Sequence, residues 1–296
     1  MDRGGIIKVR ITGGLGNQLF KFFHGLKVAN IYNEHLIIDI SWFKHGYMSS
    51  NKVNNRTYEL SYFELINSLP MFISQNKRLD LLRGKTERRL TPQIQKFLGC
   101  MTEENEYLFT RAPKLIDGSF EKISDLPDYK VINEFIKFPE KQSIWLQNEF
   151  NILESGMVVA IHVRRTDYNN LPEIYNVLTK NYYKNAVNYF REKYELVSFW
   201  LFSDDVVGAQ IYLEDIVHFD RIVNSPKDIP VGENLKLMSS FKGIIVANST
   251  FSWWAAYIGY MSGRTLDVIL PSKFSTINND YPFKYLKLPG WNMFEV

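Results

Sequence analysis

Apolar runs and amphipathic stretches alternate along the second half of the chain, which predicts strands that alternate with helices. The clearest run, residues 157–164, reads Met-Val-Val-Ala-Ile-His-Val-Arg, and an unbroken apolar run of this kind is typical of a strand buried on both faces. We predict further strands at 198–203, 218–223, 243–247 and 266–270, and helices at 181–194, 232–241 and 249–261. Asn181 is expected to cap the first of these helices. This order of elements predicts a doubly wound domain with a parallel sheet.

The first half opens with a similar alternation. A predicted strand at 6–12 leads into a glycine-rich loop at 13–18, and an apolar-periodic helix follows from Leu19 to about residue 32. A second strand is predicted at 35–40. A strand, a helix and a second strand in this order favour a parallel sheet here as well.

The middle of the chain carries a weaker pattern. Residues 41–140 show no clear periodicity, and the basic, polar stretch at 75–89 is typical of a solvated helix or loop. We place a boundary near residue 150, ahead of the buried strand, which gives two domains at 1–150 and 151–296.

One uncharged segment, residues 243–263, is long enough to span a bilayer. Its middle is polar, because it holds Asn248, Ser249, Thr250 and Ser252. We interpret it as a buried strand, a polar turn and a buried helix, with a membrane-spanning helix as the alternative. The first residues show no secretory pattern of a charged start and a long apolar run.

Composition narrows the class of protein. Of 296 residues, 45% are hydrophobic and 23% charged, which excludes a disordered chain. The formal net charge of +3 is too small to favour nucleic acid, but it suits an anionic small ligand or weak attachment to an anionic membrane face. The one cysteine, Cys100, excludes an internal disulfide and fits a reducing compartment. No cysteine–histidine cluster has zinc spacing.

Three polar clusters follow predicted strands of the second domain. They are His-Val-Arg-Arg-Thr-Asp-Tyr at 162–168, Phe-Ser-Asp-Asp at 202–205 and Asn-Ser-Thr-Phe-Ser-Trp-Trp at 248–254. Ligands of open parallel sheets bind at the carboxyl ends of strands, so we expect the clusters to form one rim.

The first cluster contains two adjacent arginines. A guanidinium is a planar fork suited to phosphate oxygens, but a structural ion pair, such as one between Arg165 and Asp167, is the alternative. Neighbouring strand residues face opposite ways. We therefore expect Arg164 to bind phosphate and Arg165 to brace the loop.

The other two clusters carry groups that could bind the phosphates, the ribose or the base of a nucleotide. Ser249, Thr250 and Ser252 open a helix, where backbone donors and the helix dipole favour an anion, although an ordinary helix cap would look the same. The tandem tryptophans that follow are expected in the helix core. Asp204 and Asp205 could accept hydrogen bonds from a guanine edge or a ribose. They could also bind magnesium, but they are adjacent, whereas the usual transferase metal motif separates two aspartates by one residue, and we expect no metal.

The glycine-rich loop of the first domain gives a weaker signal. Gly14 lies in a Gly-Gly-Leu-Gly stretch that resembles a phosphate cradle but lacks the Gly-x-Gly-x-x-Gly spacing and a Walker lysine, so a tight turn is the alternative. Asn17 and Gln18 are neutral polar groups able to bind a sugar hydroxyl.

Taken as an ordered set, the loop and the three clusters resemble the bacterial α-1,2-fucosyltransferases of glycosyltransferase family eleven. The His-x-Arg-Arg-x-Asp element at 162–167 is shared more widely among fucosyltransferases. The resemblance implies a GT-B fold, with two Rossmann-like doubly wound α/β domains facing a cleft. Residues 1–150 would shape the acceptor site and residues 151–296 would hold GDP-fucose. It also implies inversion at the anomeric carbon without a bound metal.

The resemblance assigns roles to individual residues. His162 and one of Asp204 or Asp205 would contact guanine or ribose, and Arg164 would bind the β-phosphate. Ser249, Thr250 and Ser252 would surround the diphosphate. Asn17 would sit near the reacting centre, where it could orient the acceptor hydroxyl. Asp167 is a candidate general base, with a structural role in holding Arg165 as the alternative.

The expected activity is transfer of L-fucose from GDP-fucose to the 2-hydroxyl of a galactose-type residue, in the synthesis of a surface polysaccharide such as O-antigen. The acceptor would be a galactose-containing glycan or a lipid-linked oligosaccharide. Transfer of another GDP-deoxyhexose such as colitose, and a non-catalytic nucleotide- or glycan-binding role, are the alternatives. We expect a cytoplasmic protein, with peripheral contact at the inner membrane face left open.

Overall fold

The computed structural model describes residues 5–44, 56–74, 90–153, 156–166, 178–273 and 283–296. Its contacts divide the chain into two compact units, Met1–Lys137 and Phe138–Val296. The division falls ahead of helix α7 (Ile144–Ile152), because α7 packs against α11 (Val231–Met238) of the second unit. The polar stretch at 75–89 lies outside the described residues.

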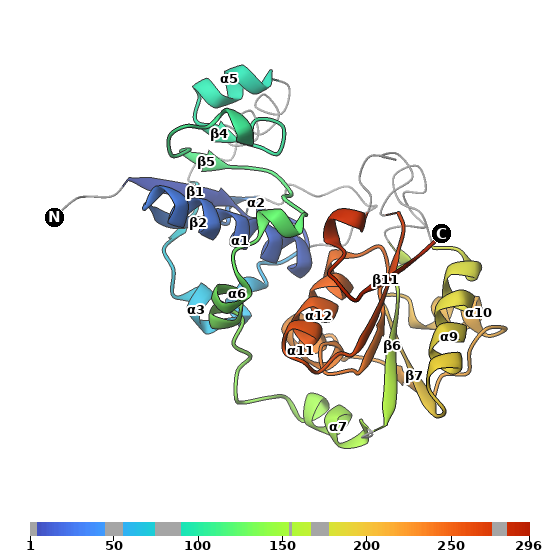
Figure 1. The fold of residues 1–296 in the computed structure, drawn as a ribbon. Helices are drawn as coiled ribbons and strands as arrows, with labels where there is room; N and C mark the ends of the chain where they lie inside the picture. Colours follow the sequence, from blue (N-terminus) through green and yellow to red (C-terminus); the bar gives the residue numbers. More distant parts are fainter. Residues whose placement is uncertain (1–4, 45–55, 75–89, 154–155, 167–177, 274–282) are drawn as a thin grey trace. The chain divides into compact units, whose positions relative to one another are not determined.

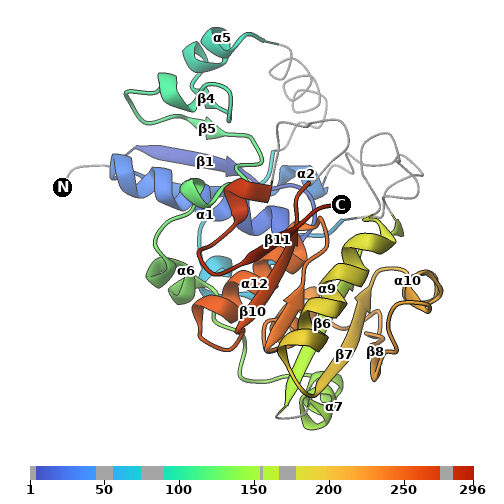
Figure 2. The same cartoon turned by 45° about the vertical axis from the view of Figure 1, so that its right-hand side comes forward.

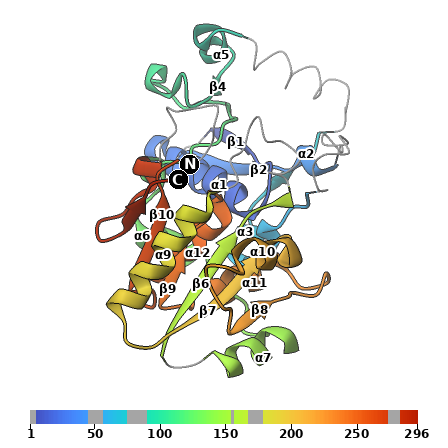
Figure 3. The same cartoon turned by 90° about the vertical axis from the view of Figure 1, so that its right-hand side faces the viewer.

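The first unit is built on a parallel sheet. Its described strands run in the order β3-β2-β1-β5-β4, and every neighbouring pair is parallel. Helix α1 (Leu15–Tyr32) packs against β1 and β2, which confirms the predicted strand–helix–strand unit (Figure 3). The strands are β1 (Ile6–Arg10), β2 (His35–Asp39), β3 (Met71–Phe72), β4 (Cys100–Met101) and β5 (Leu115–Ile116). The other helical segments are α2 (Ser41–Lys44), η1 (Leu60–Tyr62), α3 (Glu64–Asn67), α5 (Pro92–Phe97), η2 (Glu106–Leu108), η3 (Ile123–Asp125) and α6 (Tyr129–Phe135).

Helix α1 begins earlier than predicted. The sequence predicts a loop as far as residue 18, but α1 starts at Leu15. Gly13 has a φ of 81°, a conformation that favours glycine, and Gly14 is the extended N-cap residue, so the turn is complete within two glycines. Asn17 and Gln18 therefore lie in the first turn of a helix.

The second unit contains a longer parallel sheet. Its described strands run in the order β11-β10-β9-β6-β7-β8. Figures 1 and 2 show α9 and α10 against one face and α11 and α12 against the other, which is the predicted doubly wound arrangement. The strands are β6 (Met157–Val163), β7 (Val197–Ser203), β8 (Arg221–Val223), β9 (Gly243–Ile245), β10 (Asp267–Pro271) and β11 (Asn292–Phe294). The remaining helical segments are α9 (Lys180–Lys193), α10 (Val206–Leu213), α12 (Thr250–Met261) and η4 (Phe283–Leu286).

Strand β6 forms the centre of this unit. All of its residues are buried, as the unbroken apolar run predicts, because helices cover both faces of the sheet. The predicted cap of α9 is wrong. Thr179, rather than Asn181, caps this helix, because its hydroxyl accepts a hydrogen bond from the backbone N–H of Tyr182.

The uncharged segment at 243–263 forms β9, a turn and α12, as interpreted from its polar middle. Among the described residues, no helix combines the length and the apolar character needed to cross a membrane.

Candidate functional site

The carboxyl ends of β6 and β7 bring two of the predicted clusters together. The strands pair in register, with Val163 opposite Ser203. The Ser203 hydroxyl donates a hydrogen bond of 2.8 Å to the carbonyl oxygen of Val163. Residues 164–166 and residues 204–205 therefore leave the sheet side by side.

Asp204 is the centre of this edge. Its carboxylate accepts hydrogen bonds from the backbone N–H of Arg165 (2.9 Å), from the backbone N–H of Thr166 (3.2 Å) and from the Thr166 hydroxyl. Its Oδ2 also lies 3.2 Å from Nη1 of Arg164. Burial acts to raise the pKa of Asp204, but Arg164, these hydrogen bonds and His162 outweigh it and lower the pKa. Asp204 is an ionised carboxylate that shapes the loop and aligns Arg164.

The two arginines take different partners, as the strand geometry predicts. Arg165 Nε lies 3.3 Å from Asp205 Oδ2, and the guanidinium lies 4.9 Å from the centre of the Tyr212 ring on α10. Arg165 therefore holds the loop in place, as predicted, and its ion-pair partner is Asp205. Asp167, which the sequence suggested for that pairing and as a general base, lies outside the described residues.

Asp205 also supports the neighbouring helix. It is the N-cap residue of α10, and its Oδ1 accepts a hydrogen bond of 3.0 Å from the backbone N–H of Gly208. Its own N–H donates to the Ser203 hydroxyl at 3.0 Å. Both carboxylate oxygens of Asp205 thus have protein partners.

His162 is buried at the end of β6, with only 5% of its surface exposed. Burial lowers its pKa to about 4, against the raising effect of Asp204, so its ring is neutral at pH 7. Within the described ranges its Nδ1 has no hydrogen-bond partner. Its ring centre lies 6.0 Å from that of Phe251 in α12, so the first and third clusters also meet.

The start of α12 contains the third cluster. Ser249 is the N-cap residue, and its hydroxyl accepts from the backbone N–H of Phe251 at 3.4 Å. The buried Ser252 donates to the carbonyl oxygen of Ser249 at 3.3 Å, and Thr250 is also buried. Part of the cluster therefore forms an ordinary helix cap. The cluster follows β9, and β9 pairs directly with β6. Trp253 and Trp254 are fully buried, which confirms their place in the helix core.

The remaining predicted residues belong to the first unit. Gly14 is the N-cap residue of α1 and Asn17 is half-buried in its first turn. Gln18 is fully buried, and its amide donates to the carbonyl oxygens of Gly13 (2.9 Å) and Thr57 (2.8 Å). Its oxygen accepts from the N–H of Glu59 at 2.9 Å. Gln18 thus holds the backbone of residues 57–59 against α1, and binding a sugar would break those bonds.

The sequence places Thr166 and Ser203 within the predicted clusters but does not indicate a role for either. Both are ordinary small polar residues at strand ends, and only their hydroxyl contacts to Asp204 and Val163 show what they do. Among the described residues, no three His, Cys, Asp or Glu side chains gather closely enough to bind a metal ion.

Comparison with known proteins agrees with this architecture. A sequence profile of glycosyl transferase family 11 matches residues 131–295. The chain is 26% identical over 283 residues to an alpha-1,2-colitosyltransferase of Escherichia coli, covering 88% of this chain and 90% of that protein. It is 24% identical over 297 residues to the O-antigen biosynthesis glycosyltransferase WbnK of Escherichia coli, covering 91% and 95%.

Solved structures show the same fold. The chain superposes on NodZ alpha-1,6-fucosyltransferase, from crystals soaked with GDP-fucose, with a TM-score of 0.52 at 16% identity, covering 86% of this chain and 92% of that one. A second structure of NodZ, from Bradyrhizobium, gives a TM-score of 0.50 at 16% identity, covering 85% and 92%.

Two α/β units in one chain, each built on a parallel sheet, and the likeness to NodZ show the GT-B class of glycosyltransferase fold, as the sequence predicts. The profile covers more than half of the chain, and the residues of the second-unit edge lie within it. The chain belongs to glycosyl transferase family 11.

Proposed function

We propose that this chain transfers a deoxyhexose from a GDP-sugar to the 2-hydroxyl of a galactose-type residue, with inversion and without a bound metal. The observation that carries the proposal is the Asp204–Arg164 pair at the carboxyl edge of the second sheet, with the start of α12 in the same unit. This edge is where parallel sheets bind nucleotides.

The arrangement suits a diphosphate that leaves with negative charge. In the proposed reaction, an acceptor hydroxyl attacks the anomeric carbon in line, the bond to the β-phosphate oxygen breaks, and GDP takes up the electron pair. The hydroxyl proton passes to a general base, for which Asp167 is the candidate. A guanidinium carries five N–H donors, so a phosphate can share Arg164 with the Asp204 carboxylate. The N-terminus of α12, a helix of 12 residues, adds a partial positive charge. Both groups are fixed before the reaction, which is the condition for effective stabilisation of developing charge.

His162 is the candidate for nucleoside recognition. It is neutral at pH 7 because burial lowers its pKa to about 4, and a neutral imidazole can donate or accept one hydrogen bond with an uncharged ribose or guanine group. Among the described residues, its Nδ1 is one of the buried polar atoms without a partner, so a ligand would satisfy it without displacing a protein bond.

The linkage and the acceptor are supported by the relatives. The name of one relative specifies an α-1,2 linkage, and that of the other specifies O-antigen biosynthesis. The second supports a glycan acceptor. We propose that this acceptor is a galactose-containing glycan or a lipid-linked oligosaccharide and that transfer takes place in the cytoplasm. Transfer without a metal is supported by the positive groups already at the edge, which supply charge that a divalent ion would otherwise supply.

Two donors fit the proposal. GDP-fucose is the donor that the sequence motifs favour, and NodZ crystals were soaked with it. GDP-colitose is the second candidate, because a relative of similar length is an alpha-1,2-colitosyltransferase. Colitose lacks one hydroxyl that fucose has, so a single hydrogen bond to that hydroxyl would make the enzyme prefer GDP-fucose.

A donor-by-acceptor panel tests the proposal. Purified protein would be incubated with GDP-fucose, GDP-colitose or GDP-mannose and with lactose or lacto-N-biose, in buffer containing EDTA. We expect a product whose linkage analysis shows an α-1,2-linked deoxyhexose on galactose. GDP binding without product from any pair would favour the non-catalytic alternative, and activity only after addition of a divalent ion would refute the metal-free part.

A further inference from the structure

A constrained turn follows strand β5 in the first unit. β5 pairs with β1 in parallel, with Val9 opposite Ile116, so the chain after β5 leaves the sheet beside the turn that starts α1. It enters a turn of Gly118, Ser119 and Phe120, called here the 118–120 turn. Phe120 has a φ of 54°, in the left-handed region that non-glycine residues rarely adopt. Such conformations persist only where their surroundings hold them in place, and they concentrate at functional sites.

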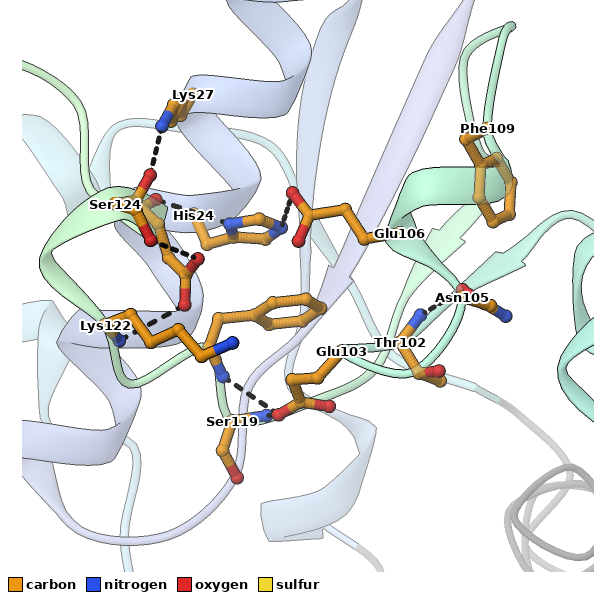
Figure 4. Close-up of polar contacts among 12 residues, drawn as sticks. His24, Lys27, Thr102, Glu103, Asn105, Glu106, Phe109, Ser119, Lys122 and Ser124 are labelled. Atoms are coloured by element: carbon orange, nitrogen blue, oxygen red, sulfur yellow. Dashed lines mark hydrogen bonds and ion pairs between the residues drawn. The ribbon is translucent and has the colours of Figure 1, made fainter. Parts of the chain in front are cut away.

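Glu103 supplies the main support of this turn. It lies in the loop after β4, and its Oε1 accepts hydrogen bonds from the backbone N–H of Ser119 and of Phe120, the latter at 2.9 Å (Figure 4). A Cβ on Gly118 would collide with the Glu103 carboxylate, so a larger residue there would displace Glu103 from the turn. One carboxylate oxygen thus fixes two successive N–H groups of the turn.

Helix α1 supports the turn from the other side. Nζ of Lys21 donates a hydrogen bond to the carbonyl oxygen of Gly118. The ring of His24 stacks on that of Phe120, with centres 3.7 Å apart and planes at 7°. Nδ1 of His24 lies 3.3 Å from the carbonyl oxygen of Asp125, and its Nε2 lies near the Glu106 carboxylate, at 3.9 Å (Figure 4).

The direction of these contacts places the turn beside a predicted site residue. Asn17 and Lys21 are four residues apart on α1, so they share one face of the helix, one turn apart. Because Lys21 reaches Gly118, the 118–120 turn lies along the face that carries Asn17. The bonds that hold the turn use only its backbone, so the hydroxyl of the half-buried Ser119 takes no part in them.

We propose that Glu103 is a positioning residue for the acceptor, because it fixes the 118–120 turn in the shape that presents the Ser119 hydroxyl to an acceptor sugar. This inference rests on the proposed function. Within the first unit, the turn lies along the face of α1 that carries Asn17, whose neutral amide suits a sugar hydroxyl. A hydroxyl on a rigid turn suits a sugar, which is bound through its own hydroxyl groups.

Steady-state kinetics with the donor that the wild-type protein uses, and with lactose and lacto-N-biose as acceptors, test this assignment. We expect Glu103→Ala to raise the acceptor KM about tenfold, the size expected from loss of a hydrogen bond made to the acceptor. The donor KM, and hydrolysis of the donor by water without acceptor, should stay within about twofold. Glu103→Gln keeps an oxygen that can accept both N–H groups, so it should restore the acceptor KM to within about threefold of wild type.

Two further variants separate this role from general stability. Glu104→Ala makes the same charge change at an exposed neighbour and should behave like wild type. Ser119→Ala keeps every support of the turn and should raise the acceptor KM about fivefold with an unchanged melting temperature. If Glu103→Ala does not fold, the acceptor KM of Ser119→Ala still tests the inference. An unchanged acceptor KM in Ser119→Ala, or an equal rise of donor and acceptor KM in Glu103→Ala, would overturn the inference. Failure of the wild-type protein to transfer any sugar would overturn the proposed function, and this inference with it.

Discussion

Asp204 and Arg164 come from the ends of two neighbouring strands, and their side chains meet with Oδ2 and Nη1 3.2 Å apart. The same carboxylate binds the backbone N–H groups of residues 165 and 166, so it fixes both the loop and the guanidinium that the loop carries. Arg164 can therefore meet a phosphate without first being ordered.

The first prediction compares the two arginines. Arg164→Ala should lower kcat by roughly a hundred- to a thousandfold, because it removes a fixed positive group from the departing diphosphate, and should lower the melting temperature by only a few degrees. Arg165→Ala should do the reverse, with a smaller loss of rate and a larger loss of stability, because Arg165 pairs with Asp205 and packs on Tyr212. Transfer kinetics and thermal unfolding of both variants check this, and equal rate losses would show that the arginines are not divided in this way.

A second matched pair lies in the first turn of α1. Gln18→Ala should reduce the free energy of unfolding by about 1–3 kcal/mol, because it removes the buried amide that binds the backbone of Thr57 and Glu59. Asn17→Ala should lower kcat, because Asn17 is proposed to orient the acceptor hydroxyl. Urea unfolding and transfer assays on the two variants give the comparison, and a stable Gln18→Ala protein would contradict the structural role of Gln18.

The fold was largely predictable where local pattern and burial agree. The apolar run of β6 and the alternation after it predict the second sheet, because a strand buried on both faces has no polar alternation. The start of α1 was missed because glycine has a low helix propensity, and only the φ of 81° at Gly13 shows that the turn ends before Leu15. The sequence does not predict helix α10 either, since Val206–Leu213 is short and its N-cap residue, Asp205, belongs to a cluster that suits a ligand.

The site was predictable only in outline. Strand-end clusters identify the edge of the second sheet because parallel strands end together. The hydrogen bonds of Asp204 to the backbone after β6, and the support of the 118–120 turn by Glu103, depend on how loops distant in sequence meet, which no local pattern encodes.

The buried histidine of the site makes a prediction about pH. The pKa of His162 is lowered from 6.5 to about 4, so above pH 6.5 the ring is neutral in both the folded and the unfolded chain and costs nothing. As the pH falls from 6.5 towards 4, only the unfolded chain gains the proton, and stability is lost. Between pH 7 and pH 5 this amounts to about 2 kcal/mol. Urea unfolding at the two pH values should show that this loss is smaller in His162→Gln, and parallel losses would contradict the assignment.

Glu121 should show the opposite dependence. Burial raises its pKa from 4.5 to about 7, with a further rise from Glu103 and a lowering by Lys21. Its contribution to stability is full below pH 4.5 and is lost as the pH rises through 7, because the unfolded carboxyl ionises first. Between pH 5 and pH 8 the loss should be about 2–3 kcal/mol, and Glu121→Gln should remove that slope. The difference between the two unfolding curves isolates this residue, and identical slopes would mean that the carboxyl is ionised throughout.

Calorimetric titration of GDP into the wild-type protein and into Arg164→Ala, both in EDTA, tests the central claim most directly. The account predicts that the wild-type protein binds GDP without a divalent ion and that the variant binds it roughly 10- to 100-fold more weakly, the size of a charge-assisted hydrogen bond. Equal affinities, or wild-type binding only after magnesium is added, would contradict it.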